Sequence, residues 1–348
     1  MGTTQMTSSL DRPAVLPASG APPSKLPGKR LGLSRRPLLI AALIAVLLAL
    51  VPVFVKDAFT IQVLLMVIMF GALGAAWNLV GGFLGRVSFG HCVFVGVGGY
   101  TTILLLQHLK LTPIIGIPLG GLLSAAIAWV VGGPTLRLAG HYFAMATIAL
   151  LQIGLLLMIN WQWAGGAVGL EAPIAEAPWM LLFRTKVPYY WIAVGLAFLT
   201  FLATWFLVHS KVGFYWRAIN GDEAAARSLG VPADRYKMLA FVLSGGITGV
   251  WGGFFAMYVG FIEPESMFSL SLSVQVVLVA ILGGVGSLLG PWLGAALLIP
   301  LSEGTRVMWG SSGLGLDLLI FGLAILLVTM FLPGGLVTLR RRRGAARR

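Results

Sequence analysis

Residues 211–237 read KVGFYWRAINGDEAAARSLGVPADRYK, and they form the one stretch inside this 348-residue chain where charge is concentrated, with five basic and three acidic side chains. The stretch separates two long apolar regions, whose runs approach the ~20 residues that a helix needs to cross a bilayer. Of all residues, 58% are hydrophobic and 10% are charged, which leaves too few polar residues to cover a soluble core of that size. We therefore predict an all-α, polytopic integral membrane protein.

Ten apolar runs have the length and the polar or Gly/Pro boundaries of membrane spans. They lie at residues 38–55, 59–80, 88–107, 113–131, 142–160, 188–208, 238–260, 270–285, 287–303 and 313–333. The two short runs between 270 and 303 leave a second alternative, in which eight spans accompany a re-entrant pair that is buried in protein or lines a cavity.

The basic residues predict the orientation of these spans. Of the 24 Lys and Arg residues, 12 lie in the two terminal tails, so the net charge of +13 indicates topology rather than nucleic-acid binding. With the N-terminal tail inside, alternation also places Arg86, Arg137, residues 211–237 and the C-terminal tail in the cytoplasm. The expected parts are a disordered basic tail over 1–37, a transmembrane domain over 38–338 with a cytoplasmic loop at 210–237, and a basic cytoplasmic tail over 339–348.

Glycines recur at four-residue spacing in two places. The two sets are Gly245, Gly249 and Gly253, and Gly286, Gly290 and Gly294. Each set predicts a smooth stripe on one helix face, where another helix packs closely. A contact that slides during gating is the alternative, and the sequence does not separate the two.

Polar side chains are embedded in two apolar runs, WNLVGGFLGRVSFGHCVFVGVGGY at 77–100 and LAGHYFAMATIALLQ at 138–152. Polar groups at this depth are costly unless they are paired or hydrated, and the many glycines of the first run predict a broken or kinked helix. The candidates for the lining of a pathway are Asn78, Ser88, His91, Tyr142 and Thr147. The alternative is a structural hydrogen-bond cluster between helices, and the sequence leaves both open.

Signatures of catalysis are incomplete. GRVSFG is not G-x-S-x-G, Asp317 has no second intramembrane aspartate, and no H-E-x-x-H occurs. The only Gly-Lys pair, Gly28 and Lys29, is followed by Arg30, so the chain has no G-x-x-x-x-G-K-[ST] P-loop. We expect no catalytic residue, metal site or cofactor in this chain, and any ATP-driven step must take place on another subunit that docks in the cytoplasm.

The centre of the charged stretch predicts a short helix. Asn220 can cap its start, Glu223 can reach back as in a capping box, and Gly230 can end it. The segment GDEAAARSLG is small enough to insert into a groove on a partner. In the alternative, it lies on the membrane surface and its arginines meet anionic lipid.

Further motifs occur in order: RAINGDEAAARSLGV at 217–231, FVLSGGITGVWGGFFA at 241–256, LGGVGSLLGPWLGAALL at 282–298 and FLPGGL at 331–336. Together with the two runs quoted above, they make the sequence resemble the permease subunits of branched-chain amino acid ABC transporters, and more narrowly the LivM type. The resemblance covers roughly residues 38–338.

The resemblance implies an importer in the bacterial inner membrane, with a homologous second permease subunit, two cytoplasmic ATPase subunits and a periplasmic or extracellular substrate-binding protein. The implied ATPase-docking surface is Arg217, Asn220, Glu223, Ala226, Arg227, Ser228, Leu229 and Gly230. External acids either contact the binding protein or are solvated loop charges; they are Glu171, Glu176, Glu263 and Glu265. The implied substrates are branched-chain amino acids, and urea or short amides are the alternative substrates. A stand-alone secondary transporter or channel is the alternative class of protein.

The sequence departs from the family pattern at several positions. Arg86 stands where Gln is usual, Cys92 where a small residue is usual, and Ala164 where Thr is common. The E-A-A motif at Glu223 also has one residue more than usual before Gly230. These departures bear on the substrate rather than on the family.

Overall fold

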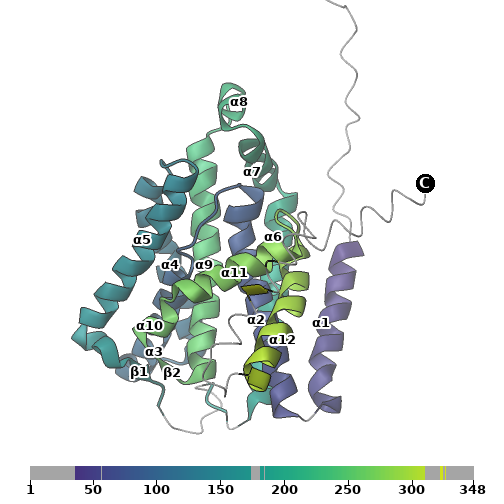
Figure 1. Cartoon of the computed structure of the whole chain (residues 1–348), viewed down its shortest axis with the longest axis vertical. Helices are drawn as coiled ribbons and strands as arrows, with labels where there is room; N and C mark the ends of the chain where they lie inside the picture. Colours follow the sequence, from purple (N-terminus) through teal and green to yellow (C-terminus); the bar gives the residue numbers. More distant parts are fainter. Residues whose placement is uncertain are drawn as a thin grey trace, which may run out of the picture. The chain divides into compact units, whose positions relative to one another are not determined.

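The structure is a computed structural model that describes residues 36–55, 57–173, 181–183, 185–309, 322–323 and 326 (Figure 1). Residues 1–35 of the predicted N-terminal tail, the predicted C-terminal tail, most of the predicted span at 313–333, and Glu176 lie outside these residues, while the last two residues of the predicted N-terminal tail belong to the helix that begins at Arg36.

The described part is almost entirely helical. The helices are α1 (Arg36–Phe54), α2 (Ala58–Asn78), α3 (Cys92–Leu109), α4 (Pro113–Thr135), α5 (His141–Asn160), α6 (Lys186–His209), α7 (Lys211–Gly221), α8 (Glu223–Ser228), α9 (Ala233–Val259), α10 (Pro264–Met267), α11 (Leu270–Gly283) and α12 (Gly290–Trp309). A π-helical turn, η1 (Leu79–Phe83), extends α2, and two 3-10 turns, η2 (Gln162–Ala164) and η3 (Gly166–Val168), follow α5. The only strands in the described part are β1 (Leu170–Glu171) and β2 (Phe261–Ile262).

Seven helical segments of the described part are long and apolar enough to cross a membrane. They are α2 with η1, α3, α4, α5, α6, α9, and α10 together with α11. The chain is therefore an all-α, multi-pass membrane protein. Ten spans and cytoplasmic termini stay predictions.

Glycine allows the central helices α3, α4 and α9 to approach very closely. A Cβ on Gly98 of α3 would lie 1.9 Å from the carbonyl oxygen of Gly249 in α9, and one on Gly252 would lie 2.1 Å from that of Val95. On the α4 side, a Cβ on Gly249 would lie 2.2 Å from Ser124 Oγ. Such distances exclude any side chain. Backbone of α9 therefore packs on backbone of α3 at Gly249 and Gly252, and the stripe of Gly245, Gly249 and Gly253 lies against the small side chains of Ala128, Ser124 and Thr102.

The prediction that Gly286, Gly290 and Gly294 lie on one helix face is wrong for one of the three glycines. Gly290 and Gly294 lie in α12, but Gly286 lies in the connection before that helix, with φ +72°. Gly284, with φ +123°, and Gly286 adopt left-handed backbone that ends α11, because residues with a side chain rarely adopt it. The region 270–303 therefore contains two helices joined by a turn, and α12 packs mainly on α2 and α11.

The charged stretch and the two strands lie at opposite ends of the helices. Figure 1 shows α8 above the other helices with α7 beside the upper end of α9, and β1 with β2 near the lower end of the helices. β1 and β2 pair antiparallel, with Leu170 opposite Ile262 and Glu171 opposite Phe261. Two connections that are distant in sequence are therefore joined at the end away from α8.

Candidate docking site

Helix α7 is anchored beneath α8 by one buried aromatic side chain. Trp216 is fully buried, and its indole Nε1 donates to the carbonyl oxygen of Tyr236 in α9 at 2.8 Å. On the outer face, Arg217 Nη2 donates to the carbonyl oxygen of Val208 near the end of α6 at 2.9 Å. Arg217 thus holds the α6–α7 corner, while its side chain stays exposed.

The start of α8 is capped by Asp222, so the predicted capping box of Asn220 and Glu223 is wrong. Asp222 Oδ1 accepts from the backbone N–H groups of Ala224 at 2.8 Å and Ala225 at 3.0 Å. Asp222 has the extended backbone that an N-cap requires, whereas Asn220 is helical within α7. The signal in the sequence was Asp itself, placed directly before the helical run. Asn220 instead donates from Nδ2 to the carbonyl oxygen of Gly82 at 3.3 Å.

The end of α8 is a Schellman turn. Gly230 has φ +84°, its N–H bonds to the carbonyl oxygen of Arg227 at 2.9 Å, and the N–H of Val231 bonds to that of Ala226 at 3.1 Å. Gly230 therefore ends the helix as predicted. The turn leaves the side chain of Leu229 at the tip of the segment, 85% exposed.

The predicted docking residues divide into two groups. The exposed members are Arg217, Asn220, Arg227, Ser228, Leu229 and Gly230. Ala226 is only 4% exposed and packs inward, so its predicted place on the contact surface is wrong. Glu223 also turns inward, because its carboxylate is held by basic side chains beneath α8.

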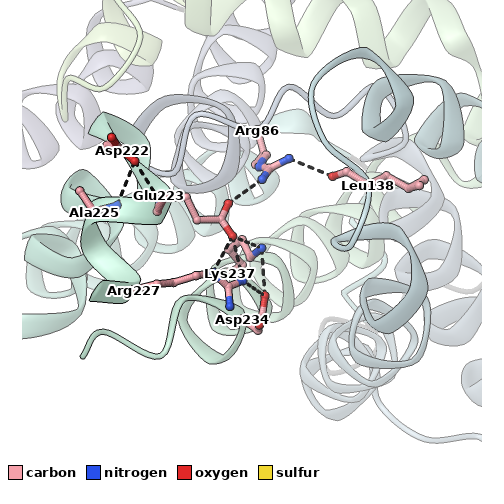
Figure 2. Close-up of polar contacts among 9 residues, drawn as sticks. Arg86, Leu138, Asp222, Glu223, Ala225, Arg227, Asp234 and Lys237 are labelled. Carbon is pink, nitrogen blue, oxygen red and sulfur yellow. Dashed lines mark hydrogen bonds and ion pairs between the residues drawn. The ribbon is translucent and has the colours of Figure 1, made fainter. Parts of the chain in front are cut away.

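Glu223 lies at the centre of an ion cluster that fastens α8 to the rest of the protein (Figure 2). Its Oε2 lies 2.8 Å from Arg86 Nη2, and its Oε1 lies 2.8 Å from Lys237 Nζ and 2.9 Å from Arg227 Nη2. Asp234 completes the cluster, 2.6 Å from Arg227 and 3.0 Å from Lys237. The cluster thus contains three cations and two carboxylates, and each of these groups is paired with at least one group of opposite charge.

The cluster compensates for the burial of its charges. The side chain of Lys237 is only 4% exposed, and an ammonium group so deeply buried is tolerated only when it is paired. Partial burial alone would raise the pKa of Glu223, but hydrogen bonds from Lys237, Arg227 and Arg86 outweigh it and lower the pKa to about 2. Glu223 is therefore ionised at neutral pH and stays paired.

Sequence reasoning found only part of this cluster. Glu223 and Arg227 are four residues apart and Asp234 and Lys237 three apart, spacings that pair side chains on a helix, so their contacts were accessible from the sequence. Arg86 is 137 residues from Glu223, and no local pattern predicts that long-range pair.

Asn78, a predicted pathway residue, fastens the end of α2 to the turn before α12. Its Nδ2 donates to the carbonyl oxygen of Ser287 at 2.8 Å, and its Oδ1 accepts from the N–H of Gly286 at 2.9 Å. The side chain is 1% exposed, and both of its polar ends are satisfied within the protein.

Ser88 and His91 belong to a chain of hydrogen bonds that joins three segments. Ser244 Oγ donates to the carbonyl oxygen of Ala76 at 2.7 Å, so it must accept from His91 Nε2, 2.8 Å away. The other ring nitrogen of neutral His91, Nδ1, then accepts from Ser88 Oγ at 3.0 Å. The geometry assigns His91 the Nε2–H tautomer.

Of the other two predicted pathway residues, only Thr147 lies near this chain. Its Oγ1 accepts from the N–H of Phe89 at 3.1 Å, whereas Tyr142 is 72% exposed in the first turn of α5. Ser88 and His91 thus belong to a hydrogen-bond cluster between helices, which was the alternative to a pathway, whereas Asn78 and Thr147 bond to backbone groups outside it. A pathway role for them stays a prediction.

Comparison with known proteins decides the family. Residues 58–330 match the family described as the permease component of branched-chain amino acid transport systems. The chain belongs to this family. No solved structure matches it.

Individual relatives agree with this family. The chain is 30% identical over 316 residues to LivM of Salmonella typhimurium and to LivM of Escherichia coli K12, each described as a high-affinity branched-chain amino acid transport system permease protein; both alignments cover 83% of this chain and 72% of the relative. It is 25% identical over 289 residues to LivH of Escherichia coli K12, covering 77% of this chain and 91% of LivH. The chain is thus a transporter permease subunit, as the resemblance to the LivM type implied.

Proposed function

We propose that this permease moves branched-chain amino acids across a bacterial inner membrane, as one of two homologous permease subunits driven by two cytoplasmic ATPases and supplied by a periplasmic binding protein. The similarity to both LivM and LivH supports a pair of related permeases. The autoinducer 2 permease LsrC of Klebsiella pneumoniae is 29% identical, but over only 47% of this chain, whereas LivM matches over 83%. This difference in coverage favours amino acids as the substrate.

The observation that carries the proposal is the exposed α8. It is short, capped at both ends and rigidly fastened by the ion cluster, and it presents Leu229 at its tip. An apolar tip on a fixed base suits insertion into a groove on an ATPase. When ATP binding moves the ATPases, α8 would move with them and shift the permease between outward-facing and inward-facing states.

The opposite end of the protein offers a surface for the binding protein. The pairing of β1 with β2 brings Glu171 next to the connection that carries Glu263 and Glu265, and all three are exposed. We expect this acidic surface to meet basic residues of the binding protein. Between the two ends, the buried polar residues Asn78, Ser88, His91 and Thr147 are the proposed border of the pathway.

Co-purification of the ATPases tests the docking proposal. Leu229→Asp places a charge at the apolar tip of α8 and should abolish association with the ATPases. Val168→Asp is the matched control, because Val168 is 80% exposed at the opposite end, beside β1, and should leave association unchanged. If Leu229→Asp still co-purifies with the ATPases at the wild-type level, α8 is not the docking site.

The substrate is tested with the assembled importer in liposomes. Uptake of radiolabelled leucine, with the binding protein present, should require ATP inside the compartment that faces α8. Unlabelled valine and isoleucine should compete, and urea should not. Uptake without ATPases would support a stand-alone transporter instead.

A further inference from the structure

We propose that Arg86 is a positioning residue that transmits movement of α8 into residues 79–91, the π-helical turn and the connection that follows it. The inference rests on the proposed docking of ATPases on α8. We call residues 79–91 the transmission segment.

The guanidinium of Arg86 joins three parts of the protein. Its Nη2 pairs with Glu223 of α8 at 2.8 Å, and its Nη1 donates to the carbonyl oxygen of Leu138, between α4 and α5, at 2.9 Å. The side chain is only 17% exposed, so solvent screens the pair little. A planar guanidinium that binds in two directions resists rotation better than a single contact would. A displacement of Glu223 must therefore displace Arg86 or break the pair.

Arg86 is the cation through which Glu223 reaches the transmission segment. Among the described residues, the other two cations on Glu223 are Arg227 of α8 itself and Lys237 at the start of α9. Removal of the Arg86 charge therefore cuts the ionic link from α8 to the segment, while Glu223 keeps two partners and α7 keeps its contact through Asn220. The fold of α8 should survive that change, which makes the role separable from stability.

The transmission segment approaches its neighbours closely at two glycines. A Cβ on Gly85, which has φ +77°, would lie 1.9 Å from Asn220 Oδ1 of α7, and one on Gly90 would lie 2.4 Å from the carbonyl oxygen of Thr147 of α5. The backbone of Gly85 thus touches the side chain of Asn220, and the backbone of Gly90 touches that of α5. Close contacts of this kind transmit displacement from one element to the next.

From Arg86 the contacts run directly into the membrane helices. Two residues later, the carbonyl oxygen of Ser88 accepts from Trp77 Nε1 at 2.7 Å, and Ser88 Oγ begins the hydrogen-bond chain through His91 and Ser244. The segment also starts with the π-helical turn η1, a form that is rare and frequent at functional sites. Movement of α8 thus has a continuous physical route to the contact between α2 and α9.

A thiol placed on the segment can report its movement. Cys92 is the only native cysteine and is buried, while Val87, next to Arg86, is 40% exposed. We would introduce Val87→Cys and measure the rate of maleimide labelling on the permease in the complete importer, nucleotide-free and trapped with ATP and vanadate. In the otherwise native importer, the two rates should differ at least about five-fold, the size of a typical coupling between sites.

Three variants in the Val87→Cys background distinguish the proposed positioning role of Arg86 from a general loss of structure. Arg86→Met keeps the apolar stem but removes both contacts, and should bring the two labelling rates together while the ATPases still co-purify. Arg86→Lys restores the charge and should recover part of the difference. Asp234→Asn, the control, removes one charge from the far side of the same cluster and should leave the difference intact.

Several results would overturn the inference. It fails if Arg86→Met keeps the nucleotide-dependent difference, if position 87 shows no difference with native Arg86, or if Asp234→Asn abolishes it equally. Loss of ATPase association in Arg86→Met alone would make Arg86 a docking residue and also overturn the role proposed here. Failure of the docking proposal is distinct, because the ATPases would then associate normally with Leu229→Asp.

Discussion

Replacement of Asn78 by leucine tests whether this residue stabilises the fold through its two hydrogen bonds or contributes only to the pathway. Asn78 is 1% exposed and satisfies two backbone groups, the N–H of Gly286 and the carbonyl oxygen of Ser287. Leucine has a similar volume but no polar atom, so it removes both hydrogen bonds; Gly286 itself is exposed and Ser287 is half-buried, so water can reach the freed groups in part. A lost hydrogen bond of this kind costs roughly 0.5–1.5 kcal/mol, and for the two together we expect a loss of about 1–3 kcal/mol in the free energy of unfolding.

The assay is unfolding of the purified permease by titration with SDS in mixed micelles. Gln152→Leu is the matched control: Gln152 is an exposed amide within α5, and its side chain makes no hydrogen bond to another described residue, so its replacement should cost nothing. A loss for Asn78→Leu below ~0.5 kcal/mol, the usual range for surface substitutions, would refute the stabilising role of Asn78. Unchanged stability with impaired uptake would instead place Asn78 in the pathway.

Three further outcomes follow from the packing and the charges. Gly98→Ala should destabilise the protein by at least about 2 kcal/mol in the same titration because its methyl group would meet backbone of α9, whereas Gly195→Ala, with open space around it, should be neutral or stabilising by up to ~1 kcal/mol. Because the pKa of Glu223 is lowered to about 2, its ionised form stabilises the fold at pH values above its ordinary pKa of 4.5. Glu223→Gln should therefore have a smaller free energy of unfolding than the native protein at pH 7. The difference between the two free energies should vanish as the pH falls from 4.5 towards about 2. Asp222→Ala should weaken α8 by about 1 kcal/mol, seen as faster hydrogen exchange at the amide of Ala224, while unchanged exchange would contradict the cap.

The positions of several membrane helices along the chain were accessible from the sequence. Runs of apolar residues gave the boundaries of α3, α4, α5 and α6 to within a few residues, because a helix in lipid must be continuous and apolar over a fixed length. The stripe at Gly245, Gly249 and Gly253 likewise marked a helix face for close packing. Gly286 misled because four-residue spacing alone does not tell a helix interior from a turn that uses glycine at positive φ.

The candidate docking site was only half accessible. The charge of residues 211–237 and the position of Gly230 predicted an exposed helix. The identity of its N-cap depended on where the preceding helix ends, and Asn220 lies within α7. The burial of Ala226 depended on how α8 leans on the protein beneath it, which no local pattern encodes.

The sequence was enough to predict an all-α membrane protein, the family that it resembles and the place of its charged segment, because hydrophobic runs, breaker residues and motifs are properties of neighbours along the chain. The pairing of the charges became visible in the folded structure. It brought Arg86 to Glu223 across 137 residues and paired both with groups from other helices. Charges attract across space without regard to sequence separation, so the folding of the helices, and not their composition, selects the partners.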